Sequence, residues 1–237
     1  EWNKNLKIKL FKESPNKFVI IGKDGVLFVN KYLNSYTHQD KFSQHELDLL
    51  KADYVERIKW LNERNIKHYL AIIPTKYNIY SEKLPLSVHK FGDMGQTEQF
   101  LESLQDIQGI NLFYLRDTLH TTKQDSKWPL YFNTDQHWNE YGAFVGYSKI
   151  ISEIRKDFPN IPEINQEQFE ITSKTTKGMS IAETILSKDD FSDTEVNVEL
   201  KNKNFKKIEY QNNYQPAEAF PYKGDFQLHY VSNNESL

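Results

Sequence analysis

The sequence predicts an α/β protein in which helices flank a parallel sheet, with a peripheral, β-rich C-terminal segment. Two short, nearly continuous apolar runs, residues 68–73 and 112–115, are typical of strands buried on both faces. Each run follows a stretch with helical periodicity, and alternation of helices with buried strands indicates a parallel sheet. We expect an α/β core at residues 14–160 and peripheral strands and loops packed on it at residues 161–237.

Turn and capping residues mark the first elements. Two apolar runs, residues 18–21 and 26–29, flank the turn sequence Gly-Lys-Asp-Gly and predict a β-hairpin. Ser43 and Glu46 have the spacing of a capping box, and apolar residues then recur every three or four positions. This pattern predicts a long amphipathic helix that ends near residue 65.

Two further helices are expected around the second apolar run. Thr97 can cap a helix that Gly109 closes, and Asn139 can cap a helix that ends before Pro159. From about residue 160 the chain is rich in Asn, Lys and Glu, which predicts short strands and loops. The segments with weak strand-like alternation are residues 196–200 and 226–231.

Composition excludes several classes of function. The 237 residues carry 30 Lys and Arg against 33 Asp and Glu, so no basic excess is available to neutralise phosphates, and we expect no nucleic-acid partner. No run of apolar residues is long enough to span a bilayer. The absence of Cys excludes a thiolate zinc site and a Cys nucleophile. The chain begins with Glu1 rather than Met, which suggests a removed signal or membrane anchor and an extracytoplasmic location.

Ligands of open α/β sheets bind at the carboxyl ends of the strands. Three segments are expected there: residues 74–78, 116–117 and 133–139. Within the third segment, Asp135 and His137 are two residues apart in a turn before a helix. This spacing lets the carboxylate accept a hydrogen bond from one imidazole nitrogen while the other faces the crevice, as in the acid and base of a Ser-His-Asp triad. The alternative interpretation is a capping Asp beside an ordinary polar His.

A set of landmarks around this pair resembles one protein family. The T-D-x-H-W-N block at residues 134–139 follows residues 21–28 and 73–76 in a characteristic order, and residues 177–182 show a weaker similarity to the same family. The order resembles the alginate O-acetyltransferase family of the AlgX and AlgJ type, over roughly residues 18–160. That resemblance implies a permuted, flavodoxin-like SGNH hydrolase-like fold, with Asp135 as the orienting acid and His137 as the general base.

The family resemblance also implies a Ser nucleophile later in the chain. No apolar strand leading into a Ser-bearing turn follows His137, so we expect the nucleophile to lie beyond Leu237 in a longer protein. An internal rival is Ser180, because residues 178–182 look like a nucleophile elbow. An elbow needs a buried strand before it, whereas residues 171–177 are polar, which favours a helix start instead.

Three further residues are candidates for substrate binding. Lys76 can stabilise negative charge at the crevice, with a solvated loop Lys as the alternative. Trp138 and Tyr131 can stack on a sugar ring, with packing in the core as the alternative. The remaining histidines have no metal-ligand spacing, and we expect neither a metal site nor another cofactor.

The resemblance implies an extracytoplasmic O-acyltransferase, in the first instance an O-acetyltransferase, that acts on a cell-surface or exported polysaccharide. It also implies a membrane-bound O-acyltransferase partner that passes the acyl group outward. Two alternatives remain at the level of sequence. One is a polysaccharide deacetylase or esterase that uses the same residues with water as acceptor, and the other is a catalytically inactive carbohydrate-binding subunit.

Overall fold

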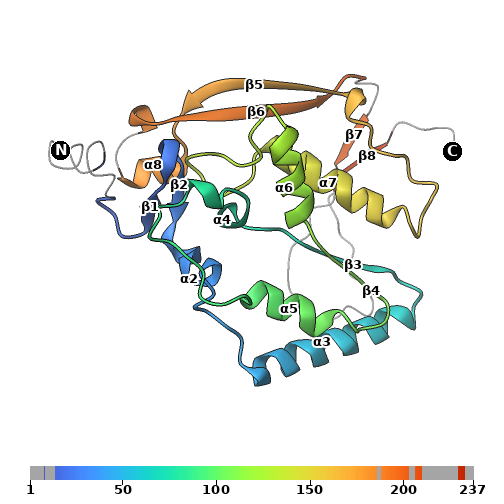
Figure 1. Cartoon of the computed structure of the whole chain (residues 1–237). Helices are drawn as coiled ribbons and strands as arrows, with labels where there is room; N and C mark the ends of the chain where they lie inside the picture. The colour runs from blue at the N-terminus through green and yellow to red at the C-terminus, as the bar shows by residue number, and fades with distance from the viewer. Residues whose placement is uncertain (1–7, 9–13, 186–187, 203–205, 210–228, 233–237) are drawn as a thin grey trace. The chain divides into compact units, whose positions relative to one another are not determined.

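The computed structural model of the chain describes residues 8, 14–185, 188–202, 206–209 and 229–232 (Figure 1). The chain divides into two compact units, of which the larger comprises Glu1–Ile164 and Ile171–Val198. The smaller unit comprises Asn165–Glu170 and Glu199–Leu237. Every side chain of the candidate site lies in the larger unit. None of the helices among the described residues is both long and apolar enough to cross a membrane.

The expected N-terminal hairpin is present. Strand β1 (Val19–Ile21) pairs antiparallel with β2 (Leu27–Val29), and Val19 faces Val29 in the register. The turn between them holds Asp24 and Gly25 at positive φ values of 55° and 78°, a region in which Gly is unstrained. The hairpin is followed by the short helix α2 (Leu33–Tyr36).

Helix α3 (Gln44–Asn62) confirms the predicted capping box. The Ser43 side chain accepts a hydrogen bond from the Glu46 amide, and the Glu46 carboxylate accepts one from the Ser43 amide at 2.7 Å. These two bonds satisfy amides that have no partner within the helix. The helix ends three residues earlier than expected, and Asn65 adopts a positive φ of 55° in the turn that follows.

The two apolar runs form a parallel pair of strands. Strand β3 (His68–Ile72) lies beside β4 (Ile110–Tyr114), with Leu70 opposite Leu112 and Ala71 opposite Phe113. Leu70 and Leu112 pack against a cluster from α3 and α5, whereas Phe113 packs against a cluster that includes residues of α6 and α7. Helices therefore cover both faces, as predicted for an α/β layer structure, although both strands are half-buried rather than fully buried.

Three helices lie after these strands, and the first two of them were not expected. Helix α4 (Lys76–Ile79) follows β3, α6 (Arg116–Asp125) follows β4, and α7 (Glu140–Ile154) begins at Asn139. The prediction for Asn139 is confirmed, because its side chain accepts a hydrogen bond from the Gly142 amide at 3.0 Å. Helix α6 escaped prediction because Leu119 is its one buried residue, too little apolar periodicity to recognise.

The predicted cap of helix α5 (Gln96–Leu104) is wrong. Gly95, not Thr97, is the N-cap residue, and its amide donates to the Glu98 carboxylate at 3.1 Å. Gly fits this position because any Cβ there would lie 2.6 Å from the His38 ring. Helix α5 also ends five residues before Gly109, which instead lies at a φ of 92° in the turn before β4.

The later part of the chain is richer in strands, as predicted. Strand β5 (Phe169–Lys177) leads to helix α8 (Ser180–Ile185), and β6 (Ser192–Leu200) pairs with β5. Strands β7 (Lys206–Glu209) and β8 (His229–Ser232) pair antiparallel in the smaller unit. The expected strand at residues 226–231 lies partly outside the described residues. Short 3-10 helices span Lys23–Gly25, Asn30–Tyr32, Ser81–Lys83, Gln166–Gln168 and Lys188–Asp190.

Candidate active site

Loops at the carboxyl ends of β3 and β4 meet, as expected for an open α/β sheet. The Asn78 amide after β3 donates to the Tyr114 hydroxyl at the end of β4, at 2.8 Å. The Tyr131 hydroxyl, which precedes the T-D-x-H-W-N block, donates to the Pro74 carbonyl at 2.5 Å. These two hydrogen bonds bring segments that are 36 to 57 residues apart in the sequence to one end of the sheet.

A short loop between β-bridged residues carries the Asp and His. Tyr131 and Trp138 pair in an isolated antiparallel bridge, and the Asn139 amide donates to the Leu130 carbonyl at 3.0 Å. The bridge closes the base of the loop, so residues 132–137 project from a fixed stem. The N-cap of α7 at Asn139 follows at once and anchors the far side of the stem.

Asp135 and His137 make the predicted contact within this loop. The Asp135 Oδ1 atom lies 2.6 Å from His137 Nδ1 and accepts a second hydrogen bond from the His137 amide at 2.9 Å. A carboxylate is an acceptor, so Nδ1 carries the proton and Nε2 is left with a free lone pair. The Asp135 side chain is 14% exposed, whereas the His137 side chain is 85% exposed. The ring is therefore held at one nitrogen and open to other molecules at the second.

The local electrostatics favour an ionised Asp135. Partial burial by itself raises the pKa of this carboxyl, but hydrogen bonds from the Ser180 hydroxyl and from the His137 amide and ring outweigh it. The pKa of Asp135 consequently lies below its ordinary value. A charged carboxylate next to the ring stabilises an imidazolium and fixes the tautomer, which is the role of the acid in a triad.

Ser180 lies on the other oxygen of the same carboxylate. Its hydroxyl donates to Asp135 Oδ2, in a hydrogen bond that spans 45 residues of sequence. Ser180 is the first residue of α8, so the alternative predicted for residues 178–182, a helix start, is confirmed. Strand β5 before it is largely exposed, unlike the buried strand of a nucleophile elbow. The hydroxyl contacts the acid of the pair rather than the base.

The structure corrects both interpretations of Lys76. Its side chain is 1% exposed, so it neither faces a ligand nor is solvated. The ammonium instead donates to the carbonyls of Phe132, Asn133 and Asp135 at 3.1, 3.1 and 2.7 Å. Burial lowers the pKa of Lys76 to about 7, while the charges of Asp193 and Asp135 act in the opposite direction. Lys76 therefore stabilises the loop by binding three of its backbone carbonyls.

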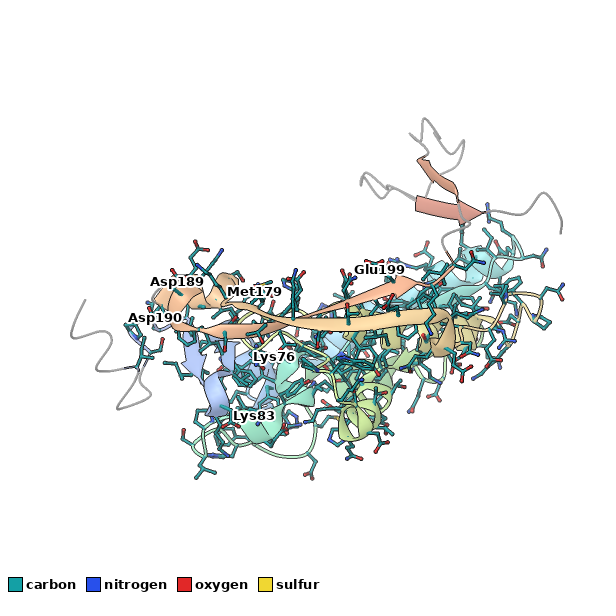
Figure 2. The ribbon with its side chains drawn as sticks, turned by 90° about the horizontal axis from the view of Figure 1, so that it is seen from above. Lys76, Lys83, Met179, Asp189, Asp190 and Glu199 are labelled. Atoms are coloured by element: carbon teal, nitrogen blue, oxygen red, sulfur yellow. The ribbon has the colours of Figure 1, made fainter. Side chains whose placement is uncertain are left out.

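The buried carboxylate of Asp193 binds backbone amides of the same loop. Asp193, at 3% exposure, accepts hydrogen bonds from the amides of Asn133 and Thr134 at 2.9 and 2.7 Å. The Thr134 hydroxyl also donates to Asp193, at 2.5 Å, and accepts from the Met179 amide at 2.7 Å. Figure 2 labels Lys76, the first residue of α4, and Met179, which directly precedes α8. Thr134 belongs to the T-D-x-H-W-N block, but its contact with Asp193 spans 59 residues and leaves no local pattern in the sequence.

The two aromatic candidates for sugar stacking have the contacts of core residues. Tyr131 is 3% exposed, which corrects its assignment to substrate binding, since a ring buried to this extent offers no face to a sugar. Trp138 is half-buried and packs with the cluster around Leu115 and Leu130. A Cβ on Gly146 of α7 would lie 2.8 Å from the Trp138 ring, so this Gly provides the space that the indole occupies.

The described residues contain no group of three His, Asp or Glu side chains arranged to hold a metal ion. The chemistry that the site offers is proton transfer. An ionised carboxylate, a fixed imidazole tautomer and an exposed Nε2 together make an acid–base pair that can activate a hydroxyl placed at that nitrogen.

A mixed α/β fold with an Asp-x-His pair at the carboxyl end of the sheet defines an SGNH hydrolase-like domain. Comparison with protein families identifies the particular one: the model described as "SGNH hydrolase-like domain, acetyltransferase AlgX" matches residues 19–218. The chain belongs to this family, which confirms the resemblance found in the sequence. The family is one of O-acetyltransferases. No curated protein sequence matches the chain.

Solved structures share the fold at low sequence identity. Bacillus cereus PatB1 with a sulfonyl adduct is 23% identical with a TM-score of 0.58, over 82% of this chain and 61% of that one. PatB1 in a second structure is 20% identical with a TM-score of 0.56, over 82% and 62%. The O-acetyltransferase domain of Pseudomonas putida AlgJ is 17% identical with a TM-score of 0.48, over 78% and 66%. The chain thus spans about three fifths of the PatB1 chains.

Proposed function

We propose that this domain transfers an acyl group, in the first instance acetyl, to a hydroxyl of an extracytoplasmic polysaccharide, with His137 as general base and Asp135 as its orienting acid. The observation that carries the proposal is the 2.6 Å contact between Asp135 Oδ1 and His137 Nδ1 on a ring that is 85% exposed. A held ring with an open Nε2 is the arrangement that general-base catalysis requires. Family membership supplies the reaction class.

The reaction follows two half-steps through one base. His137 Nε2 takes the proton of a Ser hydroxyl as the Ser oxygen forms a bond to the acyl carbonyl carbon. The imidazolium then returns that proton to the departing group, and an acyl-enzyme remains. In the second half-step Nε2 takes the proton of a sugar hydroxyl, whose oxygen attacks the acyl-enzyme, and the imidazolium reprotonates Ser as the sugar ester leaves. Asp135 stabilises the imidazolium in both half-steps.

The Ser nucleophile of this proposal is a residue outside the described part of the chain, since Ser180 is committed to Asp135. Its hydroxyl has to reach the exposed Nε2 of His137. The open side of the ring supports this assignment, because no rearrangement of the loop is needed to admit a second segment there.

The cellular location of the reaction and the partner protein are part of the proposal. Membership of the AlgX acetyltransferase family supports a location outside the cytoplasm. We propose a membrane-bound O-acyltransferase as the partner that delivers the acyl group, as the family resemblance implies.

The test uses the full-length protein with a chromogenic acetyl ester as donor and an oligosaccharide as acceptor. His137→Ala should lower transfer by about 10³-fold or more, because general-base catalysis at the nucleophile is lost. His120→Ala is the matched control, since His120 is exposed on α6 and remote in sequence from the loop, and it should leave transfer unchanged. Transfer that survives in His137→Ala would contradict the proposal.

Product analysis in the same assay separates the alternatives. Acetylated oligosaccharide supports an acyltransferase, whereas free acetate with unmodified sugar identifies an esterase that uses water at the exposed ring. Sugar binding without turnover of the ester identifies a binding subunit. Each of the last two outcomes overturns the proposed transfer reaction.

A further inference from the structure

We infer that Ser180 is a positioning residue for the Asp135–His137 pair, a role that rests on the function proposed above. Its hydroxyl donates to Asp135 Oδ2, while both donors from His137 converge on Oδ1. The two oxygens of one carboxylate are thus assigned to different partners. Ser180 prevents the carboxylate from turning about its Cβ–Cγ bond, and so keeps Oδ1 directed at the ring.

The placement of Ser180 is fixed by its neighbours on both sides. The Met179 amide donates to the Thr134 hydroxyl at 2.7 Å, and the Ile181 amide donates to the Thr134 carbonyl at 3.0 Å. Thr134 directly precedes Asp135, so these two hydrogen bonds, one to the Thr134 side chain and one to its carbonyl, set the start of α8 against the loop in one register. Ser180 then lies opposite Asp135. The contact is therefore built by the backbone and is not a chance rotamer.

The rest of α8 is anchored in the core, which makes this register stable. Ile181 and Ile185 are 5% and 4% exposed, and Ala182 is fully buried. All three pack with Val19 and Leu27 of the N-terminal hairpin. Moving the start of α8 away from the loop would expose these apolar side chains, at roughly 25 cal/mol per Å².

The electrostatic effect of Ser180 agrees with the geometry. Asp135 is partly buried, which favours its neutral form, and the hydrogen bond from Ser180 is the largest influence that lowers its pKa. A hydrogen bond to the charged form of a carboxyl favours that form. Ser180 therefore helps to keep Asp135 ionised at the pH values at which His137 must act.

The experiment compares Ser180→Ala with Ser180→Thr in the full-length protein. Ser180→Ala removes the donor and should lower kcat about 5- to 20-fold with little change in KM, a loss moderated by the exposure of Ser180. Ser180→Thr keeps the hydroxyl and should retain most activity. The control is Ser152→Ala, which removes an exposed hydroxyl whose partner is the Lys149 carbonyl in α7.

A second readout does not depend on activity. The titration of the Asp135 carboxyl, followed by carbon NMR, should move to higher pH in Ser180→Ala and stay in place in Ser152→Ala. If the wild-type protein transfers no acyl group, the proposed function fails while this titration still tests the contact. Activity and titration both unchanged in Ser180→Ala would overturn the inference.

A covalent label tests whether Ser180 is instead the nucleophile. A sulfonyl fluoride should modify a Ser other than Ser180, as mapped by peptide mass spectrometry. Modification of Ser180 itself, together with loss of activity in Ser180→Ala as complete as in His137→Ala, would replace the positioning role by a nucleophilic one.

Discussion

The burial of Lys76 should make the stability of the protein rise with pH over an unusual range. In the unfolded chain the Lys pKa has its ordinary value of 10.5, whereas burial lowers the pKa of Lys76 to about 7 in the folded chain. Between these two values the unfolded chain binds a proton that the folded chain does not. The free energy of unfolding therefore increases with pH between these two values. The stability that neutral Lys76 contributes is fully present above pH 10.5 and is lost as the pH falls towards 7.

The size of this rise in stability follows from the difference of one bound proton between the unfolded and the folded chain. A difference of one bound proton changes the free energy of unfolding by about 1.4 kcal/mol per pH unit, so the rise from about pH 8 to about pH 9.5 amounts to about 2 kcal/mol. The folded-state pKa values of Tyr77 and Tyr131 are raised by burial, which destabilises the protein only above the ordinary Tyr pKa of 10. The window below that pH therefore isolates Lys76.

Urea unfolding at constant ionic strength measures this rise in the wild type and in Lys76→Met. Met fills the buried space without a titrating group, so the free energy of unfolding of Lys76→Met should be flat from about pH 8 to about pH 9.5. At the upper end of the window Lys76→Met should be the less stable protein by about 3 kcal/mol, because the loop carbonyls lose their donor. A wild type that is flat over this window, or a variant that rises as steeply, would refute the reasoning.

Three substitutions test how the loop and its stem are held, each by the urea midpoint and by circular dichroism of the native state. Gly142→Ala should destabilise by more than about 3 kcal/mol, because its Cβ would lie 2.1 Å from the Leu130 carbonyl oxygen; a soluble variant of wild-type stability would show that the stem can shift. Asn139→Ala should lose about 1–2 kcal/mol with its cap of α7, and an unchanged midpoint would contradict the assigned cap. Thr134→Val should lose about 1–3 kcal/mol, since the buried Asp193 and the Met179 amide both lose a partner; no loss would mean that water replaces the hydroxyl.

Most elements defined by local chemistry were predictable from sequence, although the cap of α5 was assigned to Thr97 instead of Gly95. The capping box of Ser43 and Glu46, the hairpin turn and the Asn139 cap each depend on residues a few positions apart, and each is present. The Asp135–His137 contact is also local, because the backbone of one turn holds two side chains that are two positions apart close together. The parallel pairing of β3 and β4 followed from the alternation of apolar runs and helices.

Features that depend on distant partners were not predictable. A Lys in a loop is normally solvated, and only the three carbonyls that Lys76 meets across 56 to 59 residues explain its burial. Asp193 sits in a polar strand with no motif around it, yet it holds the loop amides. The motif around Ser180 predicts a nucleophile, whereas its hydroxyl contacts Asp135 because α8 lies beside the loop.

The most direct test of the account is the tautomer of His137, since every catalytic role assigned here requires a proton on Nδ1 and a free Nε2. Long-range proton–nitrogen NMR on histidine-labelled protein identifies the protonated nitrogen of the neutral ring. The account predicts the Nδ1–H tautomer in the wild type and its loss in favour of a mixture in Asp135→Ala. A wild-type ring that carries its proton on Nε2 would contradict the central claim.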